Sequence, residues 1–182
     1  MDRIKLNTIG LAEVRWTRAC SMKLGSKTLI YSGGLTYERG VDILFDVTRA
    51  KSLESWCLFS DRVVVAKLVA KPLNLGIIKG YTPTSVNENV EVEKFYEEIE
   101  KAKGYLKSQD IVIIMGDFNA KVGDERVKDV VRPSGIKTVN ERESRLIEWC
   151  QIKDLTITNT WYQNHPERQR TWKSPEKEVE TK

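Results

Sequence analysis

The stretch "IVIIMGDFNAKVG", residues 111–123, decides how the fold is interpreted. The apolar run 111–115 leads without interruption into Gly116, and Asp117 and Asn119 follow directly. Such a run is typical of a strand inside a covered sheet, because both faces of that strand are buried. The sequence therefore predicts a buried strand that ends in a carboxylate and an amide, and polar groups at such strand ends commonly bind ligands.

Two helices are predicted around this strand. Residues 88–107 place apolar side chains at helical spacing, with Glu and Lys on the opposite face. A second helix is expected to begin at Asn140, whose side chain can cap the first turn, with Glu143 three residues further on. Both helices would cover a sheet.

Strands are predicted over the remaining apolar segments: 7–16, 28–32, 40–46, 62–70, 73–81 and 155–160. Consecutive strands are expected to pair across Gly33 and Gly34 and around Pro72. The order is strands, helix, strand, helix, strand. This order predicts an α/β or α+β layered sandwich.

Composition places the chain among globular proteins. Its 182 residues suit one core, and 40% hydrophobic with 31% charged residues argues against disorder. We expect one domain over residues 1–175 and a polar, frayed tail at 176–182. The balance of 30 basic and 26 acidic residues gives a net charge of +4, which permits nucleic acid as a partner without requiring it.

Cysteine usage and hydropathy favour an intracellular protein that does not associate with membranes. The chain has three cysteines and no CxxC pair, so neither a disulfide framework nor a zinc site is expected, and a reducing compartment fits best. No apolar run approaches the length of a membrane span, and residues 1–25 lack the apolar region of a signal peptide.

Two further predicted strands end in oxygen-bearing side chains. Glu13 follows "IGLA", and Tyr81 follows "GIIKG". If these ends lie beside Asp117 and Asn119, the four side chains form an oxygen-rich site that suits Mg²⁺. A metal there would polarise a phosphodiester, while a carboxylate orients or deprotonates the attacking water.

Each of these residues also has a purely structural interpretation. Asp117 and Asn119, after a strand and a glycine, fit turn chemistry. Tyr81 could be a half-buried aromatic residue with a solvated hydroxyl. Glu13 could form a surface ion pair with Arg15.

Five segments, in this order, carry a family resemblance: "GLAEVRW" (10–16), "GYTPTS" (80–85), "MGDFNAKVG" (115–123), "NERESRLIEWCQIKDLTITNTWYQ" (140–163) and "RTWKSP" (170–175). Together they resemble the endonuclease/exonuclease/phosphatase superfamily. The likeness is greatest to the apurinic-endonuclease-like domains of LINE-type retrotransposons of the BovB kind. The resemblance covers nearly the whole chain. It implies a four-layered αββα sandwich of the DNase I type, here incomplete, and is consistent with a nuclear location.

The resemblance also implies Mg²⁺- or Mn²⁺-dependent cleavage of a phosphodiester in DNA. Glu13 corresponds to the metal-binding glutamate and Tyr81 to the tyrosine that contacts the scissile phosphate. Asp117 corresponds to the aspartate that positions or activates the attacking water, and Asn119 to the asparagine that contacts the phosphate.

The last matching segment adds two residues to the expected substrate-binding set. Thr171 and Trp172 correspond to a late "TW" strand near the DNA-facing surface.

The sequence departs from the family pattern in three places. An asparagine-bearing strand with its helix is expected before Glu13, and a Ser-Asp-His segment is expected after Trp172. Neither occurs in this sequence. We therefore expect a truncated copy with weak or no nicking activity. Asp42 stands in a strand predicted to be buried, where an unpaired carboxylate is costly.

Three functions are compatible with these features. The first is a nuclease-type phosphodiesterase domain, active or decayed. The second is a non-catalytic module that keeps the fold and binds nucleic acid or protein. The third is a phosphatase for phosphoinositides or other small phosphates, which is less favoured because the matching segments are those of the retrotransposon type.

Overall fold

The computed structural model describes residues 6–14, 16–33, 40–83, 89–136 and 139–163. The chain divides into two compact units, Met1–Asn119 and Ala120–Lys182, which are described separately below. Thr171 and Trp172 lie outside the described residues. That residues 1–175 make one domain stays a prediction.

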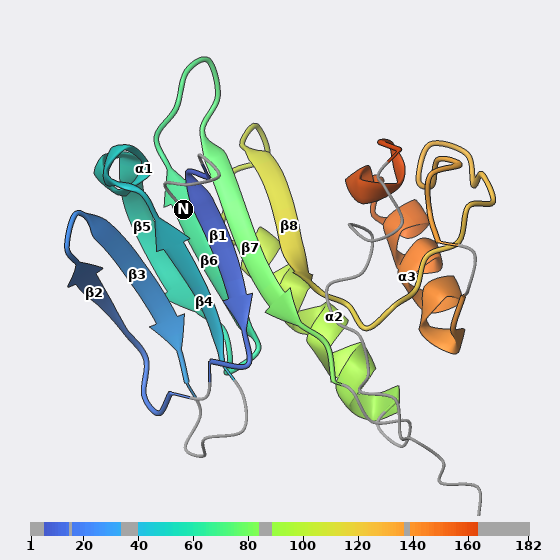
Figure 1. Cartoon of the computed structure of the whole chain (residues 1–182), viewed down its shortest axis with the longest axis horizontal. Coiled ribbons are helices and arrows are strands. Elements are labelled where there is room, and N and C mark those ends of the chain that lie inside the picture. Colours follow the sequence, from blue (N-terminus) through green and yellow to red (C-terminus); the bar gives the residue numbers. More distant parts are fainter. Residues whose placement is uncertain (1–5, 15, 34–39, 84–88, 137–138, 164–182) are drawn as a thin grey trace, which may run out of the picture. The chain divides into compact units, whose positions relative to one another are not determined.

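The first unit contains two four-stranded sheets (Figure 1). The first sheet consists, in spatial order, of β1 (Thr8–Ala12), β4 (Val41–Phe45), β3 (Lys27–Ser32) and β2 (Cys20–Leu24). All of its neighbouring strands run antiparallel. The predicted pairing of 28–32 with 40–46 is confirmed, because β3 and β4 are hydrogen-bonded neighbours.

The second sheet consists, in spatial order, of β5 (Leu53–Leu58), β6 (Val63–Leu68), β7 (Leu75–Tyr81) and β8 (Ile111–Asp117). The predicted pairing around Pro72 is confirmed by the antiparallel β6 and β7. Strands β7 and β8 run parallel, and a parallel pair needs a crossover connection. Helix α2 (Asn89–Lys103) lies in that connection, within the range predicted as helical.

The two sheets pack face to face through one apolar core: Ile30, Val41, Ile43 and Phe45 from the first sheet, and Val64, Ala66, Leu68, Ile77 and Tyr81 from the second. Helix α2 covers the other face of the second sheet. A Cβ on Gly80 would lie 2.8 Å from the ring of Phe95, so the absence of a side chain there lets α2 approach β7 closely. This mixed architecture agrees with the predicted α+β class.

Strand β8 is less buried than the sequence predicts. Ile111 and Ile113 are 51% and 46% exposed, because β8 is the last strand of its sheet. The prediction of a strand covered on both faces is therefore wrong. Strands β2 and β5 and the short helix α1 (Val47–Ser52) were not predicted, since their sequences lack a clear apolar period.

The second unit contains helix α3 (Glu141–Ile152), which begins directly after Asn140 as predicted. The Asn140 side chain makes no capping hydrogen bond, so that part of the prediction is wrong. Its Oδ1 instead accepts a hydrogen bond of 2.9 Å from the backbone amide of Lys121. The Oε1 of Glu143 accepts one of 2.6 Å from the amide of Gly123.

The strand predicted over residues 155–160 is wrong. A 3₁₀ turn, η2 (Thr158–Thr160), occupies its end. The buried Thr160 hydroxyl accepts from the Arg132 amide at 3.0 Å and donates to the Ile157 carbonyl at 2.7 Å. Such side-chain bonds to the backbone compete with strand pairing. No helix of the described residues has the length and apolarity to cross a membrane.

Candidate functional site

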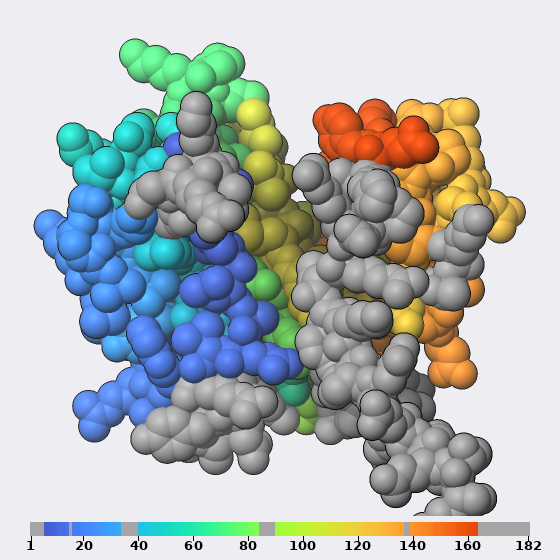
Figure 2. Space-filling model, in the orientation of Figure 1, coloured from blue at the N-terminus to red at the C-terminus, as the bar shows by residue number. Residues whose placement is uncertain are grey.

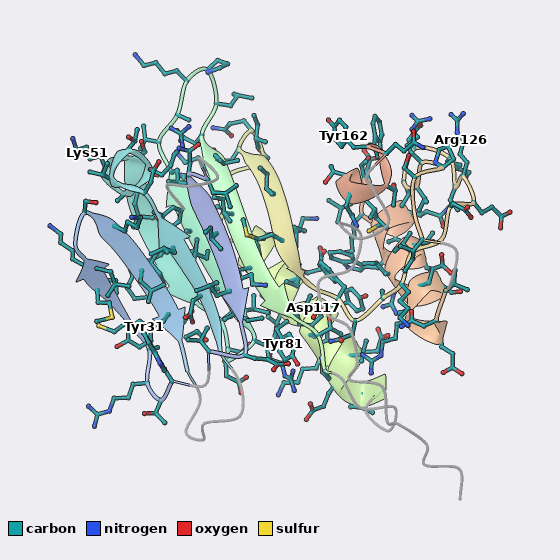
Figure 3. All side chains as sticks on the ribbon, in the orientation of Figure 1. Tyr31, Lys51, Tyr81, Asp117, Arg126 and Tyr162 are labelled. Carbon is teal, nitrogen blue, oxygen red and sulfur yellow. The ribbon has the colours of Figure 1, made fainter. Side chains whose placement is uncertain are left out.

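Three of the predicted site residues meet at one edge of the first unit. Tyr81 and Asp117 are register partners at the ends of β7 and β8, and Figure 3 shows them at the same end of the two strands. The Tyr81 hydroxyl donates a hydrogen bond of 2.5 Å to Oε1 of Glu13, which follows β1. Strand β1 contributes to the surface of this unit (Figure 2), and both carboxylates are solvent-exposed. The predicted convergence is therefore observed in the fold.

The backbone is left-handed at two of the predicted residues. Glu13 has φ 58° and Asn119 has φ 50°. Asparagine tolerates this conformation, but glutamate rarely adopts it, and such strain persists only where the surroundings fix it. The amide of Glu13 donates to the carbonyl of Gly40 at 3.0 Å, which fixes the strained residue at the end of β1.

A short network fixes the loop after β8. The Asn119 amide donates to Oδ1 of Asp117 at 3.0 Å, and the amide of Thr82 donates to the Asp117 carbonyl at 2.9 Å. The Asn119 side chain donates to the Thr82 carbonyl at 2.8 Å. The ring of Phe118 packs edge-on against Phe95 of α2, with centroids 6.0 Å apart. The turn interpretation is thus also correct, because turn bonds hold both polar side chains at the strand end.

The Tyr81 hydroxyl is a neutral donor in this site. Burial raises its pKa to about 12, and the nearby Glu13 and Asp117 carboxylates act in the same direction. The Arg62 guanidinium lies 5.8 Å from the ring centroid and acts in the opposite direction. Arg62 also pairs with Glu91 at 3.4 Å. This contact was not predicted, because nothing in the spacing of the sequence links Arg62 to Tyr81.

Two buried charged residues lie close to the site. Lys79 is 4% exposed, and burial lowers its pKa to about 8. Asp42 is fully buried on β4, and burial raises its pKa to about 6, against smaller opposing effects of the Ser32 backbone and of Lys79. The raised pKa agrees with the expected free-energy cost of burying the Asp42 carboxylate. Lys79 was not predicted as part of the site, although it stands two residues before Tyr81 and so shares its face of the strand.

The donors at this edge fit a hydrated magnesium or manganese ion. Glu13 and Asp117 offer carboxylate oxygens and Asn119 an amide, which are the hard ligands that these ions prefer. The hydroxyl of Thr82, next to this network, is buried and has no hydrogen-bond partner among the described residues. The described part of the chain contains no cluster of three or more His, Cys, Asp or Glu able to hold a metal. A bound ion would therefore keep several water ligands.

The fold is that of the DNase I-like endonucleases, as the sequence predicts. The AP endonuclease LMAP from Leishmania major matches 83% of this chain and 58% of its own, with a TM-score of 0.56 and 13% identity. The endonuclease domain of TRAS1, a telomere-specific non-LTR retrotransposon, matches 71% of this chain and 53% of its own, with a TM-score of 0.49 and 14% identity.

Among curated proteins, the chain is similar to craniofacial development protein 2 of Bos taurus. The two are 32% identical over 177 residues, which is 97% of this chain and 30% of that protein. The chain thus spans about a third of the length of this relative. No family model matches the chain. The likeness to nuclease folds that the five sequence segments indicated is confirmed.

Proposed function

We propose that the first unit carries a divalent-metal-dependent phosphodiesterase site that acts on DNA. The observation that carries this proposal is the hydrogen bond from Tyr81 to Glu13 beside Asp117, at one end of a nuclease-like fold. The left-handed backbone at Glu13 adds to it, because strain of this kind concentrates at functional sites.

Each side chain has a distinct role in this proposal. Glu13 would hold Mg²⁺ or Mn²⁺, which when bound supplies charge to polarise the phosphodiester. Tyr81, a neutral donor, would contact the scissile phosphate, as would the amide of Asn119. Asp117 would orient the attacking water and accept its proton.

DNA is the substrate that the comparisons favour. LMAP, whose fold this chain shares, is by name an AP endonuclease. The net charge of +4 is compatible with a polyanionic partner. Thr171 and Trp172 are proposed to contact DNA, and a nuclear location is proposed with it.

A plasmid-nicking assay at enzyme excess tests this function. We expect Mg²⁺ or Mn²⁺ to convert supercoiled plasmid only slowly to nicked circles, in line with the weak activity expected from the sequence, and EDTA to stop the conversion. Glu13→Gln should raise the metal concentration needed for half-maximal nicking by roughly tenfold or more. Asp124→Asn, which removes an exposed acid of the second unit, is the matched control. Nicking that is indifferent to metal, or equal in Glu13→Gln and Asp124→Asn, would refute the proposal.

The second candidate is a binding module that keeps the fold without cleavage. The side chains of the site are held by bonds within the fold, Tyr81 to Glu13 and Asn119 to the Thr82 carbonyl, which a non-catalytic module would also need. A salt-titrated DNA-binding measurement on the same samples separates the two. Salt-dependent binding without any metal-dependent nicking would favour the module.

A further inference from the structure

Lys79 lies between the two sheets, beneath the candidate site. Its stem passes over β1 at Gly10, where an added Cβ would lie 2.8 Å from Lys79 Cδ and 2.7 Å from Met115 Sδ. Gly10 therefore leaves the space that the lysine stem fills. The side chain is held by β1 on one side and β8 on the other, so its position is fixed by packing.

The ammonium group points toward the end of the strand pair. Lys79 Nζ donates to the carbonyl of Gly80 at 3.3 Å. A Cβ on Gly116 would lie only 2.3 Å from the same carbonyl oxygen, so Gly116 packs directly against it. Lys79 is the register partner of Met115 and Tyr81 that of Asp117, so Asp117 lies on the same face of the strand pair, two positions beyond Lys79.

The charges around Lys79 offset its burial only in part. An unpaired buried ammonium is unfavourable, and burial accordingly lowers the pKa of Lys79 to about 8. Asp117 and Asp42 act in the opposite direction. Lys79 therefore remains mostly charged at neutral pH, as an internal cation under a site with two exposed carboxylates.

We propose that Lys79 is a positioning residue of this site. Its buried ammonium attracts the Asp117 carboxylate across the face of the strand pair, without a direct ion pair among the described residues, and the same charge opposes the entry of a divalent cation beside Glu13. The second effect rests on the proposed function, whereas the first does not. Lys79 would thus order the Asp117 carboxylate and at the same time weaken the binding of a divalent cation at Glu13.

The test compares Lys79→Gln with Lys67→Gln. Lys67 is a second buried lysine of the same sheet, 7% exposed, that pairs with Glu54 at 3.1 Å and Asp110 at 3.7 Å. The two variants remove the same charge from one sheet, but only one of them does so beneath the site. Lys79→Met keeps the length of the stem and serves as a second variant if Lys79→Gln does not fold.

The first readout is the ¹³C resonance of the Asp117 carboxyl carbon in metal-free protein at constant pH. Lys79→Gln should shift and broaden it, and Lys67→Gln should leave it in place. A resonance that is unchanged in both folded Lys79 variants, or that moves equally in Lys67→Gln, would overturn the positioning role.

The second readout is Mn²⁺ affinity measured by calorimetry at low salt. Removing a fixed cation beside the site should tighten Mn²⁺ binding about tenfold in Lys79→Gln and leave it unchanged in Lys67→Gln. Unchanged or weaker binding in a folded Lys79 variant would overturn the competition. If the unmodified protein binds no Mn²⁺, the proposed function fails, and the carboxyl resonance still decides the positioning role.

Discussion

The two ends of the parallel strands β7 and β8 handle charge differently. At the starting end, Asp110 accepts a hydrogen bond of 2.9 Å from the amide of Lys107 and lies 3.7 Å from Lys67. Lys67 is also paired with Glu54 at 3.1 Å, and this bond is the main cause of its raised pKa. Each buried charge at this end therefore has an opposite charge beside it, which offsets the cost of removing the charges from water.

At the finishing end, where β7 and β8 stop, the charges are less completely paired. The Glu13 and Asp117 carboxylates are exposed there, Tyr81 donates without carrying charge, and the buried Lys79 bonds only to a carbonyl among the described residues. Glu13 also has a strained backbone. The proposed ligand site therefore lies at the less balanced end, where the carboxyl ends of parallel strands usually bind ligands.

The largest expected effect on nicking comes from a comparison of two single substitutions, one aspartate to asparagine at each end of β7 and β8. Asp117→Asn should lower metal-dependent nicking by roughly 100-fold or more, because it removes the group proposed to orient the attacking water. Asp110→Asn should leave the nicking rate of the folded protein unchanged and lower the free energy of unfolding by about 1–3 kcal/mol. Nicking rates and urea denaturation of both variants measure this. Equal rates in the two variants would remove the functional distinction between the ends.

Asp42 gives the next largest effect, on stability and its pH dependence. Its pKa is raised by burial from 3.8 to about 6 in the fold, so the native state binds the proton more tightly than the unfolded chain does. The stability that this proton contributes is present below about pH 4 and lost as the pH rises through about 6. Asp42→Asn should therefore be more stable than the unmodified protein by roughly 2–3 kcal/mol at pH 7, with the difference shrinking toward pH 4. A difference that does not vary with pH in urea denaturation would contradict the burial of this charge.

Tyr81→Phe should have a smaller effect on the finishing end. Loss of the bond to the Glu13 carboxylate should lower nicking about tenfold, as expected for a hydrogen bond to a charged group. Tyr105→Phe, at a partly exposed tyrosine after α2, is the matched control. Because the pKa of Tyr81 is about 12, the defect should be the same at every pH between 6 and 9. A defect confined to alkaline pH would show that the hydroxyl acts by ionising.

Asn74→Ala should have the smallest effect, at the starting end. Asn74 Oδ1 accepts a hydrogen bond of 3.2 Å from the amide of Ala70. Its removal should cost about 1 kcal/mol of unfolding free energy. Mn²⁺ affinity should stay the same, and a changed affinity in calorimetry would mean that the two ends are coupled.

The sequence predicts the strands that carry the site better than it predicts the sheet around them. The apolar run before Asp117 and the β-branched segments before Tyr81 are strong local signals, and both strands are present. The exposure of Ile111 and Ile113 could not be read from these signals, because strand order is a property of the whole sheet. The 3₁₀ turn at Thr160 was missed for a related reason, since its hydroxyl bonds to Arg132, 28 residues away in the sequence.

The site shows the same limit. Spacing and the family resemblance identify Glu13, Tyr81 and Asp117, and the fold brings all three together. The charged groups around these residues could not be predicted. Lys79 is buried where the two sheets pack together, and Arg62 lies over the ring of Tyr81, and neither contact follows from spacing in the sequence. The catalytic, metal-binding and DNA-binding roles of the site residues stay predictions.

The most direct test of the account is the anomalous diffraction of Mn²⁺ in a crystal of this protein. We predict one Mn²⁺ ion with an oxygen of Glu13 about 2.1 Å away, at the finishing end of β7 and β8, and Asp117 within reach of its water ligands. An ion bound only to Asp110 and Glu54 at the starting end, or a well-ordered Glu13 with no ion at saturating Mn²⁺, would contradict it.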